Sequence, residues 1–266
     1  YTGTITDSST QTVPGVGFQP NLTWIKRRDS ANSHQLVDSV RGVGKWLESS
    51  GTNAEETNNT HGVLTAFNAD GFVLTGGSTN ANLCCEDGNT YVSWNWLESA
   101  TAGFDIVSYT GNGSSGNTIS HSLGVAPDLM FVKRRDTTGT WQVYHASMGA
   151  EKFVELDDPY QIQDSTTRWN DTAPSSSVFT LGDNANVNAN SGTYIAYLWS
   201  GIEGSSKFGS YTGNGNADGT FIYLGFKPAF FMWKVTNEAG GWGIIDAARD
   251  PINDGTEKQL GPDDGD

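Results

Sequence analysis

The chain contains the segment Pro20-Asn21-Leu22-Thr23-Trp24-Ile25-Lys26-Arg27-Arg28-Asp29, and its pattern occurs twice more further along. The second copy reads Pro127-Asp128-Leu129-Met130-Phe131-Val132-Lys133-Arg134-Arg135-Asp136, and the third reads Pro228-Ala229-Phe230-Phe231-Met232-Trp233-Lys234. Each copy starts at a proline, continues as a short apolar run and ends in basic residues. A proline followed by an apolar run too short for a helix is typical of the start of a β-strand. We therefore expect three equivalent strands.

Other motifs recur in the same register around these strands. Tyr1-Thr2-Gly3 returns as Tyr109-Thr110-Gly111 and as Tyr211-Thr212-Gly213, and the segment from Tyr91 to Trp96 matches the segment from Tyr194 to Trp199. Self-similarity at a fixed period indicates one structural unit per period. We divide the chain accordingly into unit 1 (residues 1–103), unit 2 (residues 104–204) and an incomplete unit 3 (residues 205–266).

Further strands are expected at residues 71–74, 141–144, 152–156, 194–199 and 221–224, which are rich in aromatic and β-branched side chains. Asn112-Gly113 and Asn214-Gly215 are strong turn signals, since both residue types tolerate positive φ. No window shows a convincing helical stripe. This pattern predicts an all-β protein built from tandem antiparallel β-sandwich repeats of jelly-roll or lectin-like topology.

Unit 3 has no counterpart of the segment around Phe179, and unit 1 lacks the lead-in that precedes Tyr109. Because the chain starts and ends inside repeat units and begins with Tyr, we interpret it as a piece of a longer polypeptide. Half a sandwich exposes open strand edges. Three alternatives follow: the remaining strands lie elsewhere in the polypeptide, unit 3 packs on its neighbours without them, or another subunit donates them.

The composition is typical of an extracellular or virion β-protein. Aromatic residues make up 11% of the 266 residues and charged residues only 17%, with 33 glycines. The formal net charge of −15 argues against nucleic-acid binding and disfavours adhesion to anionic membranes. No apolar run approaches the ~18 residues of a membrane-spanning helix, so we expect no membrane insertion.

Two charged patterns recur between the copies. The basic clusters Lys26-Arg27-Arg28 and Lys133-Arg134-Arg135 each precede an aspartate, which favours structural ion pairs over recognition of acidic glycans or phosphates. Asp38 with Arg41 and Asp246 with Arg249 share the spacing Asp-x-x-Arg, which predicts local ion pairs that order a turn. A partly exposed pair of this kind contributes about 0–1 kcal/mol to stability.

Trp169 is the candidate platform for carbohydrate. Most of the nine tryptophans lie in strand patterns, whereas Trp169 lies in a loop-like context between Arg168 and Asn170 and has no match in every copy. An exposed indole flanked by polar side chains is suited to stacking on a sugar ring, although a core position is the plainer interpretation.

Metal and catalytic signals are weak. Asp157-Asp158 offers oxygen ligands for Ca²⁺ but lacks the spacing of an EF-hand, so a solvated loop is the default and no cofactor is expected. Cys84 and Cys85 are adjacent and could form only a strained vicinal disulfide or two free thiols. The four histidines have no zinc spacing, and no nucleophile or phosphate-loop motif appears, so we expect no enzyme.

The ordered motifs resemble a domain family of unknown function that is common in virion structural proteins of tailed bacteriophages, especially marine ones. The resemblance rests on residues 17–29, 37–42, 70–74 and 91–96, and departs at Asn95, where that family often has Cys between the two tryptophans. It implies a role in a virion, tail fibre or appendage and carries no catalytic residues.

Three functions therefore stand as hypotheses, with a virion or extracellular location expected for the first two. The first is a non-enzymatic virion structural protein, part of a phage tail fibre or an extracellular fibre, which assembles with copies of itself or with other virion proteins. The second is an adhesion module for a host-surface glycan. The third is a glycosidase-like enzyme. Glu55-Glu56 and Asp157-Asp158 are adjacent pairs, whereas glycosidase carboxylates face each other across a cleft, an arrangement that a sequence does not show.

Overall fold

The computed structural model describes residues 1–251 and 259–264, and these are almost entirely β. The all-β prediction is confirmed, and two helices of four residues each, α1 and α2, join the strands of unit 2. The elements of the described residues are β1 (Thr10–Pro14), β2 (Leu22–Arg27), β3 (Gln35–Asp38), β4 (Val63–Asn68), β5 (Gly71–Thr75), β6 (Tyr91–Trp96), β7 (Phe104–Thr110), β8 (Asn117–Ser120), β9 (Leu129–Arg134), β10 (Gln142–His145), β11 (Lys152–Glu155), β12 (Gln163–Asp164), α1 (Thr166–Trp169), β13 (Val178–Leu181), α2 (Ala185–Asn188), β14 (Thr193–Trp199), β15 (Phe230–Lys234) and β16 (Trp242–Asp246).

Unit 1 is a sandwich of two three-stranded antiparallel sheets. Its inner sheet has the order β3-β2-β6 and its outer sheet the order β1-β5-β4. Ile25 and Val37 of the inner sheet are buried in one cluster with Phe72 and Leu74 of the outer sheet. The expected sandwich is therefore present, with the outer sheet covering one face of the inner one.

Unit 2 repeats this arrangement with a larger inner sheet. The inner sheet has the order β12-β11-β10-β9-β14-β7, and β13 and β8 form a two-stranded outer sheet. Phe179 and Leu181 of β13 are buried against Val132 of β9 and Leu198 of β14. The outer sheets, of three and two strands, are smaller than the two sheets of an eight-stranded jelly roll.

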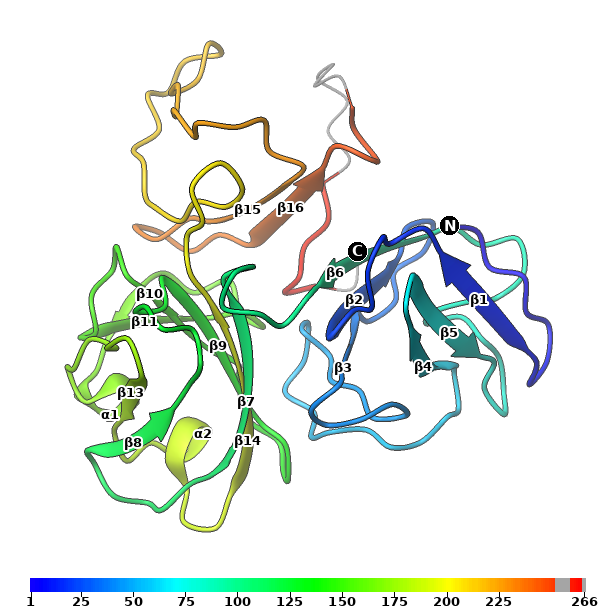
Figure 1. The fold of residues 1–266 in the computed structure, drawn as a ribbon. Helices are drawn as coiled ribbons and strands as arrows, with labels where there is room; N and C mark the ends of the chain where they lie inside the picture. Colours follow the sequence, from blue (N-terminus) through cyan, green and yellow to red (C-terminus); the bar gives the residue numbers. More distant parts are fainter. Residues whose placement is uncertain (252–258, 265–266) are drawn as a thin grey trace.

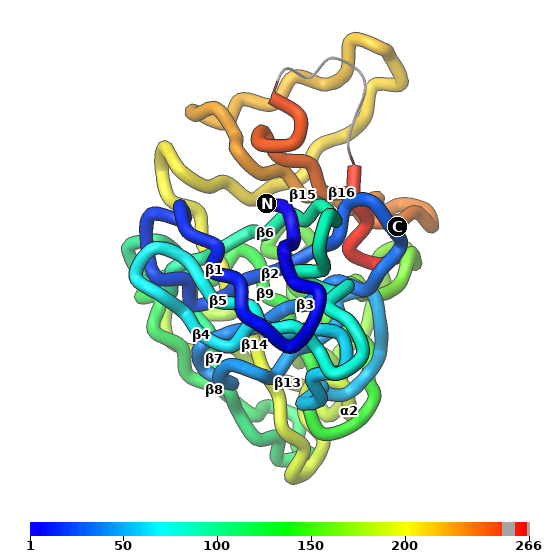
Figure 2. The backbone as a smooth tube through the Cα atoms, turned by 90° about the vertical axis from the view of Figure 1, so that its right-hand side faces the viewer, coloured from blue at the N-terminus to red at the C-terminus, as the bar shows by residue number. Residues whose placement is uncertain are grey.

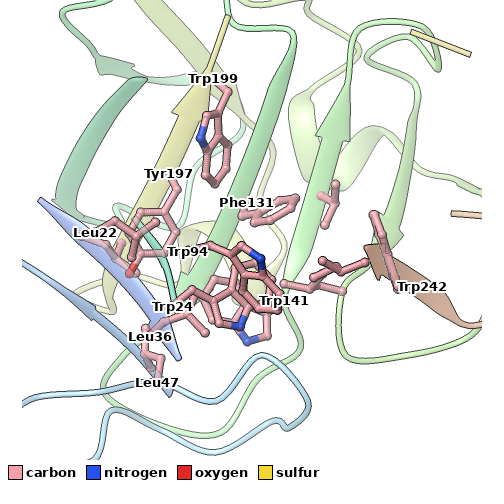
Figure 3. Close-up of a cluster of buried hydrophobic side chains, with 14 of the residues drawn as sticks. Leu22, Trp24, Leu36, Leu47, Trp94, Phe131, Trp141, Tyr197, Trp199 and Trp242 are labelled. Atoms are coloured by element: carbon pink, nitrogen blue, oxygen red, sulfur yellow. The ribbon is translucent and has the colours of Figure 1, made fainter. Parts of the chain in front are cut away.

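The opposite faces of the inner sheets meet in a central aromatic cluster shared by all three units. Figure 1 shows three lobes, and Figure 3 shows side chains from each of them at the centre. Trp24 and Trp94 come from unit 1, Trp141 and Tyr197 from unit 2, and Trp242 from unit 3. Because neighbouring residues on a strand point to opposite faces, the inner sheets of units 1 and 2 are buried on both sides. This explains why β2 and β9 read as continuous apolar runs.

Hydrogen bonds between corresponding residues join unit 1 to unit 2 and unit 2 to unit 3. The indole Nε1–H of Trp141 donates to the carbonyl of Glu48 at 2.6 Å, and that of Trp242 donates to the carbonyl of Glu155 at 2.8 Å. In the same way, the backbone N–H groups of Gly139 and Gly240 donate to the carbonyls of Thr52 and Pro159, respectively. The two interfaces are therefore built from residues at corresponding positions.

Unit 3 also contacts unit 1, which closes a ring of three units. The hydroxyl of Ser49 donates to the carbonyl of Pro262 at 2.8 Å. His34 and Trp141 occupy corresponding positions, because each directly precedes the strand that pairs with the repeated apolar run. The backbone of Gly261 faces the imidazole of His34.

A buried ion pair lies at each of two unit interfaces. The guanidinium Nε of Arg41 contacts Asp38 at 2.5 Å, and the phenol of Tyr197, from unit 2, donates to the same carboxylate at 2.7 Å. Both charged side chains are 0% exposed. Burial alone would lower the pKa of Arg41, but the electrostatic effects of Tyr197, Asp38 and Glu55 outweigh it and raise this pKa above its ordinary value.

The second pair repeats the arrangement between units 3 and 1. Nε of Arg249 contacts Asp246 at 2.6 Å, and the indole of Trp94, from unit 1, donates to that carboxylate at 3.1 Å. The expectation of partly exposed pairs worth about 0–1 kcal/mol is therefore wrong. Removing one partner of a buried pair leaves an uncompensated charge, which costs about 3–5 kcal/mol.

We predict that Tyr197→Phe destabilises the protein by about 1–3 kcal/mol, because the carboxylate of Asp38 loses a buried hydrogen bond from another unit. Urea unfolding followed by circular dichroism measures the change. Tyr160→Phe is the matched control, since Tyr160 is 59% exposed, and it should leave the midpoint unchanged. Equal stability of Tyr197→Phe and the wild type would contradict a stabilising contact between units 1 and 2.

We also predict that acid lowers the stability of the folded chain, because His34 is buried where units 1 and 3 meet. Burial, followed by the nearby charge of Lys26, lowers the pKa of His34 from 6.5 to about 3. The unfolded chain then binds the extra proton first, so the stability that neutral His34 contributes is complete above pH 6.5 and is lost as the pH falls towards 3. The loss should reach about 3 kcal/mol by roughly pH 4.5, since each pH unit between the two pKa values corresponds to about 1.4 kcal/mol.

His34→Gln removes this titration and keeps a side-chain acceptor for the indole N–H of Trp24, which donates to Nδ1 of His34 at 2.8 Å. Burial raises the pKa of Asp157 to about 7, and this group acts with the opposite sign in the same pH range. The test is therefore the difference in unfolding free energy between variant and wild type from pH 7 to pH 4.5. A difference that does not change with pH would contradict the assignment.

Candidate functional site

The outward face of β15 and β16 in unit 3 is only partly covered, unlike the same face in units 1 and 2. Phe231 and Trp233 point to this face, stack with ring centroids 5.2 Å apart and remain partly exposed. Their counterparts are fully buried: Ile25 and Val132 match Trp233 in the repeated stretch. The difference follows from the outer sheets, which cover Ile25 and Val132.

The part of unit 3 that the structure describes contains two strands, β15 and β16, which pair with each other. The equivalent strands β2 and β9 each pair on a second side as well, with β6 and β14. Within the described residues no strand pairs with the other edge of β15. Unit 3 therefore combines an uncovered aromatic face with an open strand edge.

The segment of residues 207–227 lies as an irregular loop on the outer side of β15 and β16 (Figures 1 and 2). Phe221, Tyr223 and Tyr211 in this loop are 86%, 74% and 51% exposed. The strand expected at residues 221–224 is not formed. The physical reason is the partner: β8, which follows the same Tyr-Thr-Gly motif in unit 2, is held by β13, whereas no described strand pairs with residues 221–224.

A groove of about 530 Å³ separates this loop from β15. Tyr211, Ile222 and Phe231 form its apolar wall, and Asn214 and Asn216 contribute amide groups. The outward face, the open edge of β15 and this groove together are called the unit 3 face below. An exposed aromatic surface beside an unpaired strand is suited to binding a polypeptide rather than to catalysis.

Three arginines of the two basic clusters form ion pairs with carboxylates of the same chain. Arg27 pairs with Asp29 at 2.6 Å and Arg134 pairs with Asp136 at 2.9 Å, at corresponding positions of units 1 and 2. Arg135 pairs with Glu55 of unit 1 at 2.9 Å. These contacts order turns and join units.

The lysines and Arg28 complete the two clusters. Lys133 is buried and donates to the carbonyl of Gly139 and, at 3.3 Å, to that of Gly51 in unit 1, while burial lowers its pKa to about 8. Lys26 is buried too, and its ammonium lies 3.4 Å from the carbonyl of Ser30. Arg28 is exposed at the surface.

Trp169 is not an exposed platform for carbohydrate, and the structure agrees with the plainer interpretation, a core position. Trp169 ends helix α1, is 1% exposed and packs edge-on against Tyr144 in the core of unit 2. Arg168 lies over the ring of Phe153 and donates to Gln142 at 2.5 Å, and Asn170 forms the left-handed cap of α1. The short helix turns the indole inward, so Trp169 offers no surface for a sugar.

The remaining candidates lie in ordinary structural settings. The thiols of Cys84 and Cys85 are free and buried, with their Sγ atoms 3.2 Å apart. Asp157 accepts the backbone N–H of Trp141 at 2.9 Å, and Asp158 accepts that of Tyr160 at 2.9 Å. Within residues 1–251 and 259–264, no three His, Cys, Asp or Glu side chains come together in a way that could hold a metal ion.

Residues 1–266 match the family model described as Domain of unknown function (DUF7483), so the chain belongs to that family. No curated protein and no solved structure matches the chain. Among the described helices, none has the length and apolar character needed to cross a membrane. The family description assigns no function, and the resemblance to phage virion proteins stays a prediction.

We predict that Trp169→Ala destabilises the chain by about 3–5 kcal/mol, since it leaves a large cavity in the core of unit 2. Thermal unfolding measures the loss. Phe221→Ser, which removes an aromatic ring that is 86% exposed, is the control and should change stability by less than about 0.5 kcal/mol. A Trp169→Ala variant as stable as the wild type would contradict the buried position of the indole.

Proposed function

We propose that this chain is a non-enzymatic structural protein that acts by assembly, as part of a phage tail fibre, another virion appendage or an extracellular fibre. The observation that carries the proposal is the unit 3 face. It presents Phe231 and Trp233 beside the open edge of β15, at a position where units 1 and 2 bury the corresponding residues. The motif resemblance to virion structural proteins supports the same function.

Contacts with units 1 and 2 hold β15 and β16 in place, which makes the unit 3 face suitable for assembly. Phe230, on the opposite side of β15, packs against Trp94 and Trp96 of unit 1 with ring centroids 5.8 and 5.9 Å apart. Trp242 of β16 is hydrogen-bonded to unit 2. Because both neighbouring units hold β15 and β16, these two strands are pre-organised for a partner.

The net negative charge of the chain makes this assembly depend on the salt concentration. At a formal net charge of −15, copies of the chain repel one another at low ionic strength. Salt screens this repulsion and leaves the apolar attraction intact. Association through the unit 3 face should therefore strengthen as salt is added, which is the opposite of the behaviour of an interface made of ion pairs.

We predict that the chain associates in a concentration-dependent manner, more strongly in 0.5 M than in 0.05 M NaCl (about a tenfold salt range). Sedimentation velocity and light scattering measure the mass distribution. The double variant Phe221→Ser, Tyr223→Ser should be monomeric under the same conditions, because both rings are exposed on the loop of the unit 3 face. The control Tyr160→Ser, on unit 2, should associate as the wild type does.

A monodisperse monomer at every concentration and salt level would overturn self-assembly.

A glycan array under the same conditions tests adhesion, which is the second candidate because Tyr211, Asn214 and Asn216 line the groove. Glycan binding by the monomer, lost in Tyr211→Ser, would favour adhesion over assembly.

A further inference from the structure

We infer that a polar pocket on unit 1 binds an uncharged carbohydrate through adjacent hydroxyl groups of the sugar ring. The pocket has a volume of about 500 Å³, which is in the range of small-ligand sites. It shares no residue with the unit 3 face, so the inference goes beyond the proposed assembly function and does not depend on it. The polar side chains that line the pocket include those of Thr6, Arg27, Asn80, Glu86, Asp87 and Asn89.

The pocket presents hydrogen-bonding groups that the described residues leave unused. Nη1 of Arg27 donates to Oε2 of Glu86 at 3.2 Å, and the amide of Asn89 donates to the same oxygen at 2.7 Å. Nη2 of Arg27 and Oε1 of Glu86 have no hydrogen-bond partner among the described residues. The same holds for the carboxylate of Asp87 and for Nδ2 of Asn80. Unused donors and unused acceptors therefore line one pocket.

Unit 2 forms the same turn without these groups. The backbone N–H of Glu86 donates to the hydroxyl of Tyr91 at 3.1 Å. In unit 2, the N–H of Ala189 donates to the hydroxyl of Tyr194 at 2.7 Å. Glu86 and Ala189 therefore occupy corresponding positions, and the turn does not need a carboxylate there.

The end of the turn corresponds in the same way. The N–H of Gly3 donates to the carbonyl of Asn89 at 2.8 Å, and in unit 2 the N–H of Gly111 makes this bond at the same length. The acceptor in unit 2 is the carbonyl of Gly192. The two turns thus share a backbone and differ in side chains: Glu86, Asp87 and Asn89 of unit 1 are replaced in unit 2 by Ala189, Asn190 and Gly192.

The two arginines beside these turns are used differently. In unit 2, Nε and Nη2 of Arg134 contact Asp136 at 2.9 and 3.1 Å, and Nη1 donates to the carbonyl of Ala185 at 3.4 Å. In unit 1, Arg27 contacts Asp29 through Nε alone, at 2.6 Å, which leaves Nη2 for a ligand. The polar pocket is therefore a property of one copy, and the shared fold does not require its side chains.

The charges and the hydrogen-bonding groups favour an uncharged polyol as the ligand. The carboxylates of Asp29, Glu86 and Asp87 outnumber the single positive charge of Arg27, so an anion is repelled. A cation offers donors only and would leave the donors of Arg27 and Asn80 unused. A hydroxyl group both donates and accepts, so adjacent hydroxyls satisfy a guanidinium and a carboxylate together.

The course of unit 2 shows that chain on the N-terminal side leaves this turn open. The residues before Tyr109 form β7, which pairs with β14 in the direction of Trp199 and away from Gly192. The equivalent position in unit 1 lies beside β6, whereas the pocket lies past the other end of that strand, before Tyr91.

The test measures binding of D-glucose, D-galactose and D-mannose to the whole chain by saturation-transfer NMR, followed by titration. We expect at least one of these sugars to bind, equally well at low and high salt because it carries no charge. The triple variant Glu86→Ala, Asp87→Asn, Asn89→Gly gives unit 1 the turn sequence of unit 2, so its thermal unfolding should match that of the wild type. It should bind the sugar at least about tenfold more weakly, because hydrogen bonds to charged groups are lost.

Two single variants provide a matched comparison. Arg27→Met should weaken sugar binding to a similar degree, whereas Arg134→Met, at the corresponding position of unit 2, should leave it unchanged. Equal effects of the two substitutions would contradict a site on unit 1.

Absence of binding by all three sugars, or binding that the triple variant keeps, would overturn the inference. Binding of glucosamine or N-acetylneuraminic acid in place of these sugars would overturn the assignment to an uncharged ligand. Binding that is lost in Tyr211→Ser but kept in the triple variant would place the site in the groove of unit 3 instead. The triple variant should associate as the wild type does in sedimentation velocity, so this inference and the assembly proposal fail separately.

Discussion

The inner sheets of units 1 and 2 are apolar on both faces, and no unit can cover both faces alone. One face is covered by the unit's own outer sheet and the other by the neighbouring units, through the cluster that contains Trp24, Trp141, Tyr197 and Trp242. A single unit taken from the ring would expose several aromatic rings, which is a large loss beside a typical stability of about 5–15 kcal/mol. The units are therefore repeats in sequence but parts of one core in space.

The polar contacts at the ring make the aromatic packing specific. Aromatic clusters tolerate sliding, whereas a buried carboxylate must meet its donors at hydrogen-bond distance. Asp38 and Asp246 each receive bonds from an arginine of their own turn and from an aromatic donor of the next unit, Tyr197 or Trp94. A buried ion pair adds little net stability compared with apolar packing but penalises every arrangement that leaves it unpaired. These contacts therefore fix the position of each unit relative to its neighbours.

The sequence predicted local features well and long-range ones poorly. The strands at the repeated stretch follow from short apolar runs, and the Asp-x-x-Arg spacing indicated pairs that the structure places at 2.5 and 2.6 Å. Burial of those pairs was missed because the covering side chains come from another unit. The lack of a repeat match made Trp169 a candidate sugar platform, but it is no measure of exposure, which depends on the turn of α1. The ring of three units has no local signature, since side-chain contacts that close it join residues as far apart as 87 and 213 positions.

Unit 3 shows that the conformation of an outer strand in this fold depends on its partner and not on its own sequence alone. Residues 220–224, Thr-Phe-Ile-Tyr-Leu, have a higher β propensity than Asn117–Ser120, yet only the latter form a strand, because β13 pairs with them. A two-stranded ribbon is marginal without a covering layer. A partner that covers β15 would therefore also favour a strand at residues 220–224, and the ordering of this loop would be coupled to binding. The exposed rings of Phe221 and Tyr223 would then have a core to enter.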